Sequence, residues 1–342
     1  MSGLSAREAR MSDTVETQTV QAGYFGKLPS RGDFVRSSDQ HRLMSLLDRW
    51  AASSLDQFSH NPDWKTLYDQ APWLHFAFLG SRSQLAIAGH MLPSSDASQR
   101  RYPFLSALRL QVADTAGFIA RSPLALFPVW RELATESSRA VHSTDPASEL
   151  AELGQRNFTV EIQPQTYEGR FQQLLEQETL AGLEKSMHRA GHPMVALKRS
   201  LPALGLLLQP LMSQQQVSID KGLILPLPAE AQAQALTATW WLDMLTGFVR
   251  RGDFELAVLI RGGEVPAMII GFNGADHQIL RSVWDPNVAE SHLIAVQDAD
   301  WVEDYMAMNV SLNRLASYID RGDLSLGSAR RFFMETFLGG EI

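Results

Sequence analysis

The chain has 342 residues, of which 45% are hydrophobic and 20% are charged, and its formal net charge at pH 7 is −8. This composition indicates a soluble globular protein, and the acidic balance argues against general nucleic-acid binding, which needs a basic surface. The absence of cysteine excludes disulfides, thiolate metal sites and cysteine nucleophiles, and it fits a cytoplasmic protein.

No segment predicts a membrane span or an export signal. The most apolar run, at residues 201–212, is interrupted by Pro202 and Pro210 and is too short to cross a bilayer. Residues 1–20 are polar and lack the cationic and apolar regions of a signal peptide, so we predict a disordered tail there. We therefore expect a protein without membrane insertion.

The first half of the chain alternates strand and helix signals. Leu43 and Trp50 belong to an apolar stripe at helical spacing, which follows a candidate N-cap at Ser38 or Asp39. Apolar runs on either side of the polar turn at residues 81–84 predict a β-hairpin. The predicted elements, in order, are a strand at residues 22–26, a helix at 38–58, hairpin strands at 73–80 and 85–92, a strand at 104–112, and a helix at 122–140 with Pro123 in its first turn.

The second half begins after residues 144–165, which mix proline, glycine and charge and are the best candidate for a boundary. The sequence Arg-Gly-Gly-Glu at residues 261–264 separates two apolar runs and predicts a second hairpin. The predicted elements here are a helix at residues 167–188, a strand at 217–227, a helix at 229–248, hairpin strands at 254–260 and 266–272, a strand at 279–284, and helices to the end of the chain.

These elements predict an α/β (α+β) protein of two packed halves, with mostly antiparallel sheets and flanking helices. The expected domains are the disordered tail at residues 1–20, an N-terminal domain at 21–145 and a C-terminal α/β domain at 165–342. Arg-Gly-Asp triplets begin at Arg31, Arg251 and Arg321. Because Gly-Asp favours tight turns, these triplets are read as turns and not as adhesion motifs.

Two polar loops are the most distinctive feature of the chain. The first loop, residues 23–36, reads GYFGKLPSRGDFVR and combines three aromatic residues with turn formers and charges. The second loop, residues 93–103, reads PSSDASQRRYP and is again charged and bounded by proline. Rigid, charged loops of this kind form functional sites more often than they contribute to the packed core.

Catalytic arrangements can be drawn from the same loops. Two of them are a serine nucleophile with a histidine base, and a metal or phosphate held by aspartates and arginines. Neither has a recognised catalytic spacing, and salt bridges that fix one loop against the other explain the charges more simply. Scattered histidines likewise show no zinc-binding pattern. The residues of these alternatives are Ser94 or Ser95, His75 or His90, and Asp33 or Asp96 for the first, and Asp33, Asp96, Arg31, Arg100 and Arg101 for the second.

The first loop resembles the N-terminal signature of the TagF/ImpM family of type VI secretion system-associated proteins. Two further blocks support the resemblance, one beginning at Trp64 and one formed by the second loop. Gln99 departs from the pattern, because the family usually has glycine at that position. The matching residues are Gly23, Phe25 to Ser30, Gly32 to Val35, Trp64, Tyr68, Ala71 to Trp73, Phe76, Pro93, Ser94, Asp96, Arg100 and Tyr102 to Phe104.

The resemblance implies a cytoplasmic bacterial accessory protein of the type VI secretion system that has no enzymatic activity and no cofactor. It implies post-translational repression of secretion through protein–protein interaction with a forkhead-associated scaffold protein. Two alternatives remain open, namely a structural subunit of the secretion apparatus and a hydrolase acting on phosphorylated protein. The partner-binding residues that we predict are Lys27, Ser30, Arg31, Asp33, Arg36, Asp96, Arg100 and Arg101.

Overall fold

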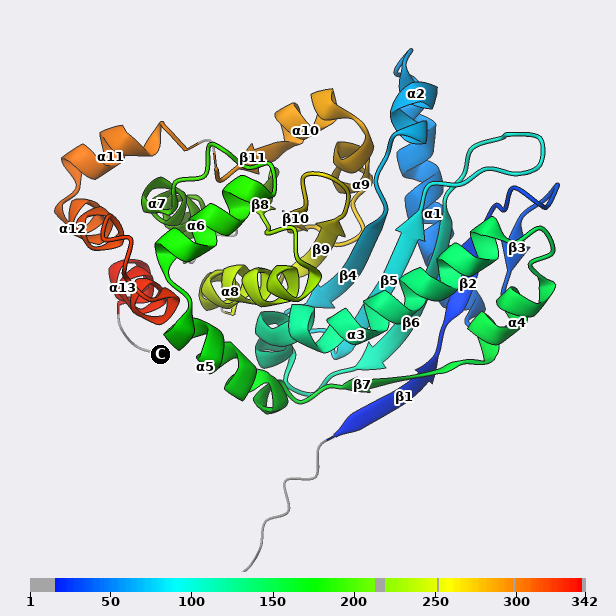
Figure 1. The fold of residues 1–342 in the computed structure, drawn as a ribbon, viewed down its shortest axis with the longest axis horizontal. Coiled ribbons are helices and arrows are strands. Elements are labelled where there is room, and N and C mark those ends of the chain that lie inside the picture. The colour runs from blue at the N-terminus through cyan, green and yellow to red at the C-terminus, as the bar shows by residue number, and fades with distance from the viewer. Residues whose placement is uncertain (1–15, 213–218, 251, 298, 340–342) are drawn as a thin grey trace, which may run out of the picture.

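A computed structural model describes residues 16–212, 219–250, 252–297 and 299–339 of the chain. Short runs of strands and short runs of helices follow one another along the sequence (Figure 1). The strands are β1 (Thr17–Gln21), β2 (Gly23–Gly26), β3 (Val35–Arg36), β4 (Leu74–Gly80), β5 (Leu85–Leu92), β6 (Phe104–Gln111), β7 (Asn157–Glu161), β8 (Gly222–Pro226), β9 (Glu255–Arg261), β10 (Ala267–Gly271) and β11 (Leu293–Ala295).

Helices make up the rest of the ordered framework. The first half contains α1 (His41–Phe58), α2 (Trp64–Asp69), α3 (Thr115–His142) and α4 (Ala147–Gln155). The second half contains η1 (Pro164–Tyr167), α5 (Glu168–Gln177), α6 (Leu180–Arg189), α7 (Leu197–Leu208), η2 (Gln209–Met212), α8 (Ala231–Val249), α9 (His277–Trp284), α10 (Pro286–His292), α11 (Val302–Met308), α12 (Val310–Ile319) and α13 (Leu326–Leu338).

Strands from both halves form one continuous sheet. Its order is β11-β8-β10-β9-β4-β5-β6-β2-β3, and every neighbouring pair is antiparallel except β11 with β8. The halves meet where β4 pairs with β9, which places Leu74 opposite Arg261 and Gly80 opposite Glu255. The prediction of a mixed α/β fold with mostly antiparallel strands is confirmed, and the two halves share this sheet.

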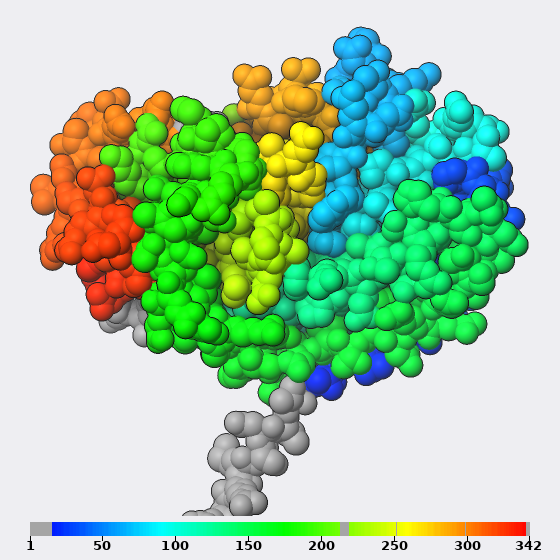
Figure 2. All heavy atoms as spheres, viewed as in Figure 1, coloured from blue at the N-terminus to red at the C-terminus, as the bar shows by residue number. Residues whose placement is uncertain are grey.

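Successive side chains of each strand point to opposite sides of the sheet. Both faces therefore carry apolar side chains, and helices cover both. On β4, Phe76 and Phe78 pack with α1 and α9, whereas Ala77 and Leu79 pack with α3 and α8. Figure 2 shows the blue and cyan residues of the first half at one end of the molecule and the orange and red helices α11 to α13 at the other. Within the described residues, no helix combines the length and apolar character that crossing a membrane requires.

Several predicted elements of the first half need correction. The helix predicted at residues 122–140 is α3, which begins at Thr115, so Pro123 lies inside it. Proline in a helix leaves the carbonyl four residues earlier without its usual donor, and here the hydroxyl of Ser122 donates to the Ile119 oxygen at 2.9 Å. At the N-terminus, β1 pairs with β7, so residues 17–20 are not disordered as predicted, and residues 1–15 lie outside the described residues.

The second half also differs from the prediction in places. The strand predicted at residues 279–284 is the helix α9, because its buried Ile279, Leu280 and Val283 follow helical spacing and Asp276 caps the Gln278 amide. The helix predicted at residues 167–188 is the pair α5 and α6, since Thr179 caps a new helix. Both predicted hairpins are confirmed as β4–β5 and β9–β10.

Candidate functional site

The first loop leaves the sheet at a position where only glycine fits. Gly26 ends β2 with φ 144°, and a Cβ atom there would lie 2.2 Å from the Pro103 oxygen. The backbone of the first loop therefore touches the end of the second loop directly. The loop then turns through a hydrogen bond from the Arg31 amide to the Leu28 oxygen, and it returns to pair Arg36 with Phe25.

Asp96 of the second loop is the centre of the contact between the loops. Its Oδ2 lies 2.9 Å from Lys27 Nζ and 2.7 Å from Arg100 Nε, and its Oδ1 accepts from the amides of Ser98 and Arg100 at 2.9 Å each. Lys27 is 7% exposed and Asp96 is 1% exposed. Burial raises the pKa of Asp96, but these hydrogen bonds outweigh burial and hold the pKa well below its usual range.

Further hydrogen bonds make one rigid unit of the two loops. Arg100 Nη2 donates to the Gly32 oxygen at 2.8 Å, the Ala97 amide donates to the Arg31 oxygen at 2.8 Å, and Ser94 Oγ donates to the Lys27 oxygen at 2.7 Å. These bonds use backbone groups as well as side chains, so they fix the course of both loops. We call this unit, residues 26–36 and 93–103, the paired loops.

Phe34 is an exposed aromatic side chain on the paired loops. It is 41% exposed, and its ring stacks on Phe25 at 5.1 Å and meets the edge of Tyr102 at 4.9 Å between centroids. Lys27 Nζ lies 5.0 Å from the same ring centroid. The sequence prediction did not include Phe34, although a large apolar residue inside a charged loop is a signal for an interaction site.

The structure divides the predicted partner-binding residues by depth. Asp33, Arg36 and Arg100 are exposed, and the half-exposed Arg31 pairs with Asp145 at 2.8 Å. Lys27 and Asp96 are buried, so they hold the loops in place beneath that surface.

Two other predicted residues have different surroundings. The Ser30 hydroxyl is buried with no hydrogen-bond partner in the described part of the chain. Arg101 points to α2, where its Nε and Nη2 donate to the two carboxylate oxygens of Asp69 at 2.7 and 2.5 Å. This hydrogen bond lowers the pKa of Asp69. Arg101 thus joins the second loop to a neighbouring helix.

Gln99, which replaces the usual glycine of the family pattern, keeps the backbone conformation that favours glycine. Its φ is 59°, in the left-handed region. Its amide donates to the Asp96 oxygen at 2.8 Å, and the turn brings the Arg100 amide to Asp96 Oδ1. The turn is therefore formed in spite of the substitution, at some cost in backbone strain.

The serine–histidine alternative is not assembled in this structure. Ser94 Oγ donates to the Lys27 oxygen, whereas Nδ1 of His75 and Nδ1 of His90 lie 3.0 Å apart in a buried pair. Among the described residues, no hydrogen bond joins Ser94 or Ser95 to either histidine. The same part of the chain contains no group of three histidine or acidic side chains arranged to hold a metal ion.

Comparison with known proteins identifies the part of the chain that carries the paired loops. Residues 23–155 match the TagF N-terminal domain family, described as Type VI secretion system-associated. No curated protein matches the sequence. The crystal structure of PA0076 from Pseudomonas aeruginosa PAO1 is similar, with 22% sequence identity and a TM-score of 0.33 over 40% of this chain and 62% of that chain, which is less than two thirds of its length. The resemblance seen in the two loops is confirmed for residues 23–155.

Proposed function

We propose that this protein, in which residues 23–155 are a TagF N-terminal domain, is a cytoplasmic, non-enzymatic accessory protein of the type VI secretion system. It is a post-translational repressor of secretion, and it acts by binding a forkhead-associated scaffold protein. The observation that carries this proposal is the buried contact of Asp96 with Lys27 and Arg100, which holds two charged loops as a single exposed surface.

Rigidity of the paired loops favours binding, because a surface that is already ordered loses little conformational entropy when a partner arrives. Hydrogen bonds from the Ala97 amide, the Ser94 hydroxyl and the Arg100 guanidinium to backbone oxygens of the first loop support this rigidity. Phe34 provides the exposed aromatic side chain that commonly anchors a protein interface, and Lys27 Nζ lies 5.0 Å from its ring centroid. The surface therefore combines an exposed aromatic side chain with charged groups, as specific interfaces do.

The charges of the paired loops indicate the kind of surface that they bind. Arg31, Arg36 and Arg100 reach solvent, and the exposed acidic side chains near them are Asp33 and Asp145, which pairs with Arg31. This local excess of positive charge stands on a chain whose formal net charge is −8. An acidic patch on the scaffold protein would complement it and would accelerate association at low salt.

The hydrogen bonds that the acidic residues of the paired loops accept support a non-enzymatic role. Both oxygens of Asp96 are occupied by cations and backbone amides, so this carboxylate is not available to hold a metal ion or to accept a proton from substrate. Asp33 Oδ1 accepts from the adjacent Phe34 amide, which is ordinary turn chemistry.

The proposal is tested by measuring capture of the purified scaffold protein. The variant Arg31→Ala/Asp33→Ala removes two charges from the paired loops and leaves the buried contact of Lys27 and Asp96 intact. We expect its affinity for the scaffold to fall by about tenfold or more. The variant Arg321→Ala/Asp323→Ala alters another exposed Arg-Gly-Asp triplet, at the turn before α13, and provides a matched control. Equal affinities in both variants and the natural protein would refute the proposed surface.

Two further measurements separate the proposed function from its alternatives. Deletion of the gene should increase secretion if the protein is a repressor, whereas a structural subunit of the apparatus would give loss of secretion. Purified protein should release no phosphate from a generic phosphate ester in the presence of a series of divalent ions. Turnover that depends on Asp33 would favour the hydrolase alternative.

A further inference from the structure

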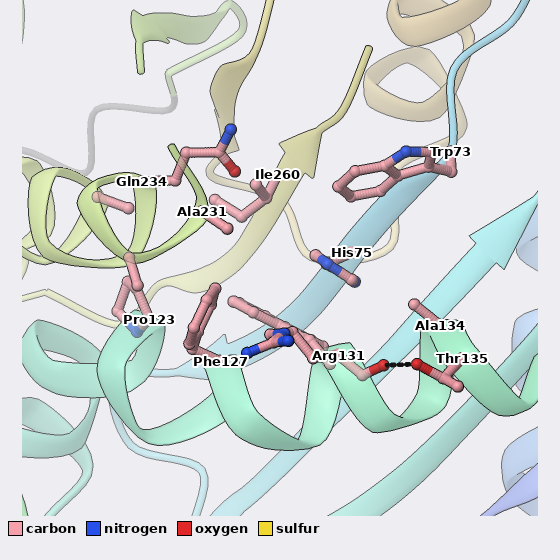
Figure 3. A pocket seen from close by; sticks show the side chains of 13 residues that line it. Trp73, His75, Pro123, Phe127, Arg131, Ala134, Thr135, Ala231, Gln234 and Ile260 are labelled. Carbon is pink, nitrogen blue, oxygen red and sulfur yellow. Dashed lines mark hydrogen bonds between the residues drawn. The ribbon is translucent and has the colours of Figure 1, made fainter. Parts of the chain in front are cut away.

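A cavity lies away from the paired loops, between helices of the two halves. It has a volume of about 270 Å³ and is bounded by α3, α8 and the strands β4 and β9 (Figure 3). Its walls are mainly apolar and include Trp73, Phe127, Trp130, Ala235 and Ile260. The cavity therefore offers flat aromatic and aliphatic surfaces to an apolar group.

The aromatic side chains of the cavity are held in fixed positions. Trp130 Nε1 donates to the Phe76 oxygen at 3.2 Å, and the Trp130 ring stacks on His75 with 5.4 Å between centroids and 7° between planes. Trp73 lies against Gly262, where a Cβ atom would approach the indole to 2.2 Å. Gly262 thus leaves room for the Trp73 ring.

His75 supplies a buried polar group in this apolar lining. It is 7% exposed, its Nδ1 lies 3.0 Å from His90 Nδ1, and its ring lies between Trp73 and the α3 side chains (Figure 3). The contact with His90 uses Nδ1 of His75 and does not involve its Nε2. Burial lowers the pKa of His75 well below its ordinary value, so the ring is neutral at neutral pH. A neutral imidazole offers either a donor or an acceptor to a ligand, according to its tautomer.

Arg131 provides a cation beside the same cavity. Its side chain is exposed, its guanidinium carbon lies 5.8 Å from the Phe127 ring centroid, and within the described residues it forms no ion pair. The nearby Thr135 hydroxyl donates to the Arg131 carbonyl at 2.9 Å, which leaves the guanidinium of Arg131 itself available (Figure 3). An arginine placed in this way binds a carboxylate through a pair of parallel hydrogen bonds.

We propose that this cavity binds a small aromatic carboxylate. Its ring lies among Trp73, Phe127 and Trp130, a polar ring atom bonds to His75, and the carboxylate bonds to Arg131. At about 270 Å³ the cavity is slightly smaller than the usual range of small-molecule sites, about 300–1,000 Å³, which suits a compound of one or two rings. Ring stacking favours an aromatic ligand over an aliphatic chain.

The position of the cavity gives such a ligand contact with both halves of the protein. α3 belongs to the matched residues 23–155, whereas α8 and β9 lie beyond them. A bound ligand would bridge α3 and α8 across the sheet face on which they pack. Binding should therefore raise the melting temperature of the whole chain, because the ligand stabilises the state in which both helices are in place.

The test uses calorimetric titration and ligand-observed NMR of the full chain with three probes. Indole-3-acetate has the ring, a ring N–H group and the carboxylate, 1-naphthaleneacetate lacks the N–H group, and indole-3-ethanol lacks the carboxylate. We expect indole-3-acetate to bind with Kd of about 1 mM or tighter. Indole-3-ethanol should bind about tenfold more weakly, and 1-naphthaleneacetate about threefold more weakly.

Three variants locate the binding. Arg131→Gln should raise the Kd of indole-3-acetate about tenfold and leave that of indole-3-ethanol unchanged. Ala134→Phe places a ring at the half-buried wall of the cavity and should weaken both probes. Arg49→Gln removes an exposed arginine from α1 on the opposite face of the sheet and serves as the charge-matched control.

The proposal is overturned if indole-3-acetate does not bind at millimolar concentration. It is equally overturned if Arg131→Gln and Ala134→Phe bind this probe as tightly as the natural protein, since binding would then occur elsewhere. Equal affinities for indole-3-acetate and indole-3-ethanol would refute the carboxylate and its contact with Arg131. Circular dichroism of each variant excludes loss of the fold as the cause.

Discussion

The ammonium group of Lys27 and the carboxylate of Asp96 lie 2.9 Å apart beneath the paired loops. The two residues belong to different loops, and the β4–β5 hairpin and helices α1 and α2 separate them along the chain. Their contact, together with that of Arg100, fixes the first loop to the second. The exposed surface of both loops therefore depends on an ion pair that is buried beneath it.

In the variant Asp96→Asn, the free energy of unfolding should decrease less on acidification than in the natural protein. Burial raises the pKa of Asp96, but hydrogen bonds from Arg100 and Lys27 lower the pKa by more than burial raises it. The folded state therefore keeps the carboxylate ionised at lower pH than the unfolded state. The contribution of Asp96 is complete above about pH 5 and is lost as pH falls through 4 and below. Urea unfolding at pH 7, 4 and 3 should show a deficit of the variant that shrinks with acid. A deficit that stays constant would contradict this assignment.

Gln99→Gly should stabilise the protein. The left-handed backbone at φ 59° costs a residue with a side chain about 1–2 kcal/mol, and the greater freedom of glycine in the unfolded chain cancels part of the gain. We expect a net increase of about 0.5–1 kcal/mol in the free energy of unfolding. Ala97→Gly in the same loop, where φ is not positive, should instead lower stability. The prediction is wrong if both glycine substitutions change stability in the same direction.

The buried histidine pair should make the natural protein less stable in mild acid. Burial lowers the pKa of His75 well below its ordinary value and that of His90 to about 3, so the unfolded chain takes up protons that the folded chain does not. Stability is therefore highest above about pH 6.5 and falls below it by up to about 1.4 kcal/mol per pH unit for each histidine.

The double variant His75→Leu/His90→Leu tests this prediction. Between pH 7 and 5 its free energy of unfolding should lose less than that of the natural protein, whatever its stability at pH 7. Parallel curves for the two proteins would show that these histidines do not cause the pH dependence.

Asp243→Asn should be strongly destabilising, because Asp243 ties α8 to two other helices. Its Oδ1 accepts from Arg121 Nη1 of α3 at 2.7 Å, and its Oδ2 accepts from Arg330 of α13. Removing the charge leaves the buried Arg121 with only its ion pair to Glu168, so we expect a loss of up to about 3 kcal/mol, less than that of a buried charge without any partner. Asp320→Asn, which breaks only the exposed pair with Lys198, should cost less than about 1 kcal/mol. Similar losses in guanidinium unfolding of both variants would contradict the prediction.

Local signals in the sequence predicted much of the secondary structure. The β4–β5 and β9–β10 hairpins and the helices α1 and α8 follow from apolar spacing and turn residues, which act over a few positions. The prediction was wrong at α9, where the same short apolar run is compatible with a strand or a helix. It was also wrong at Pro123, where the proline was taken as the first turn of a helix. The candidate site was likewise found from two loops whose composition is unusual for linkers.

The sequence by itself determined the class of fold, the two charged loops and the family of the first half. Only the tertiary structure decided that β4 pairs with β9 and that Asp96 is buried beneath the loops. It alone brought His75 and Arg131 to one cavity. The physical reason is that spacing along the chain fixes which face a side chain occupies, whereas its neighbours depend on how distant segments pack. A charged residue in a loop looks the same in the sequence whether its side chain contacts water, an oppositely charged side chain or a partner protein.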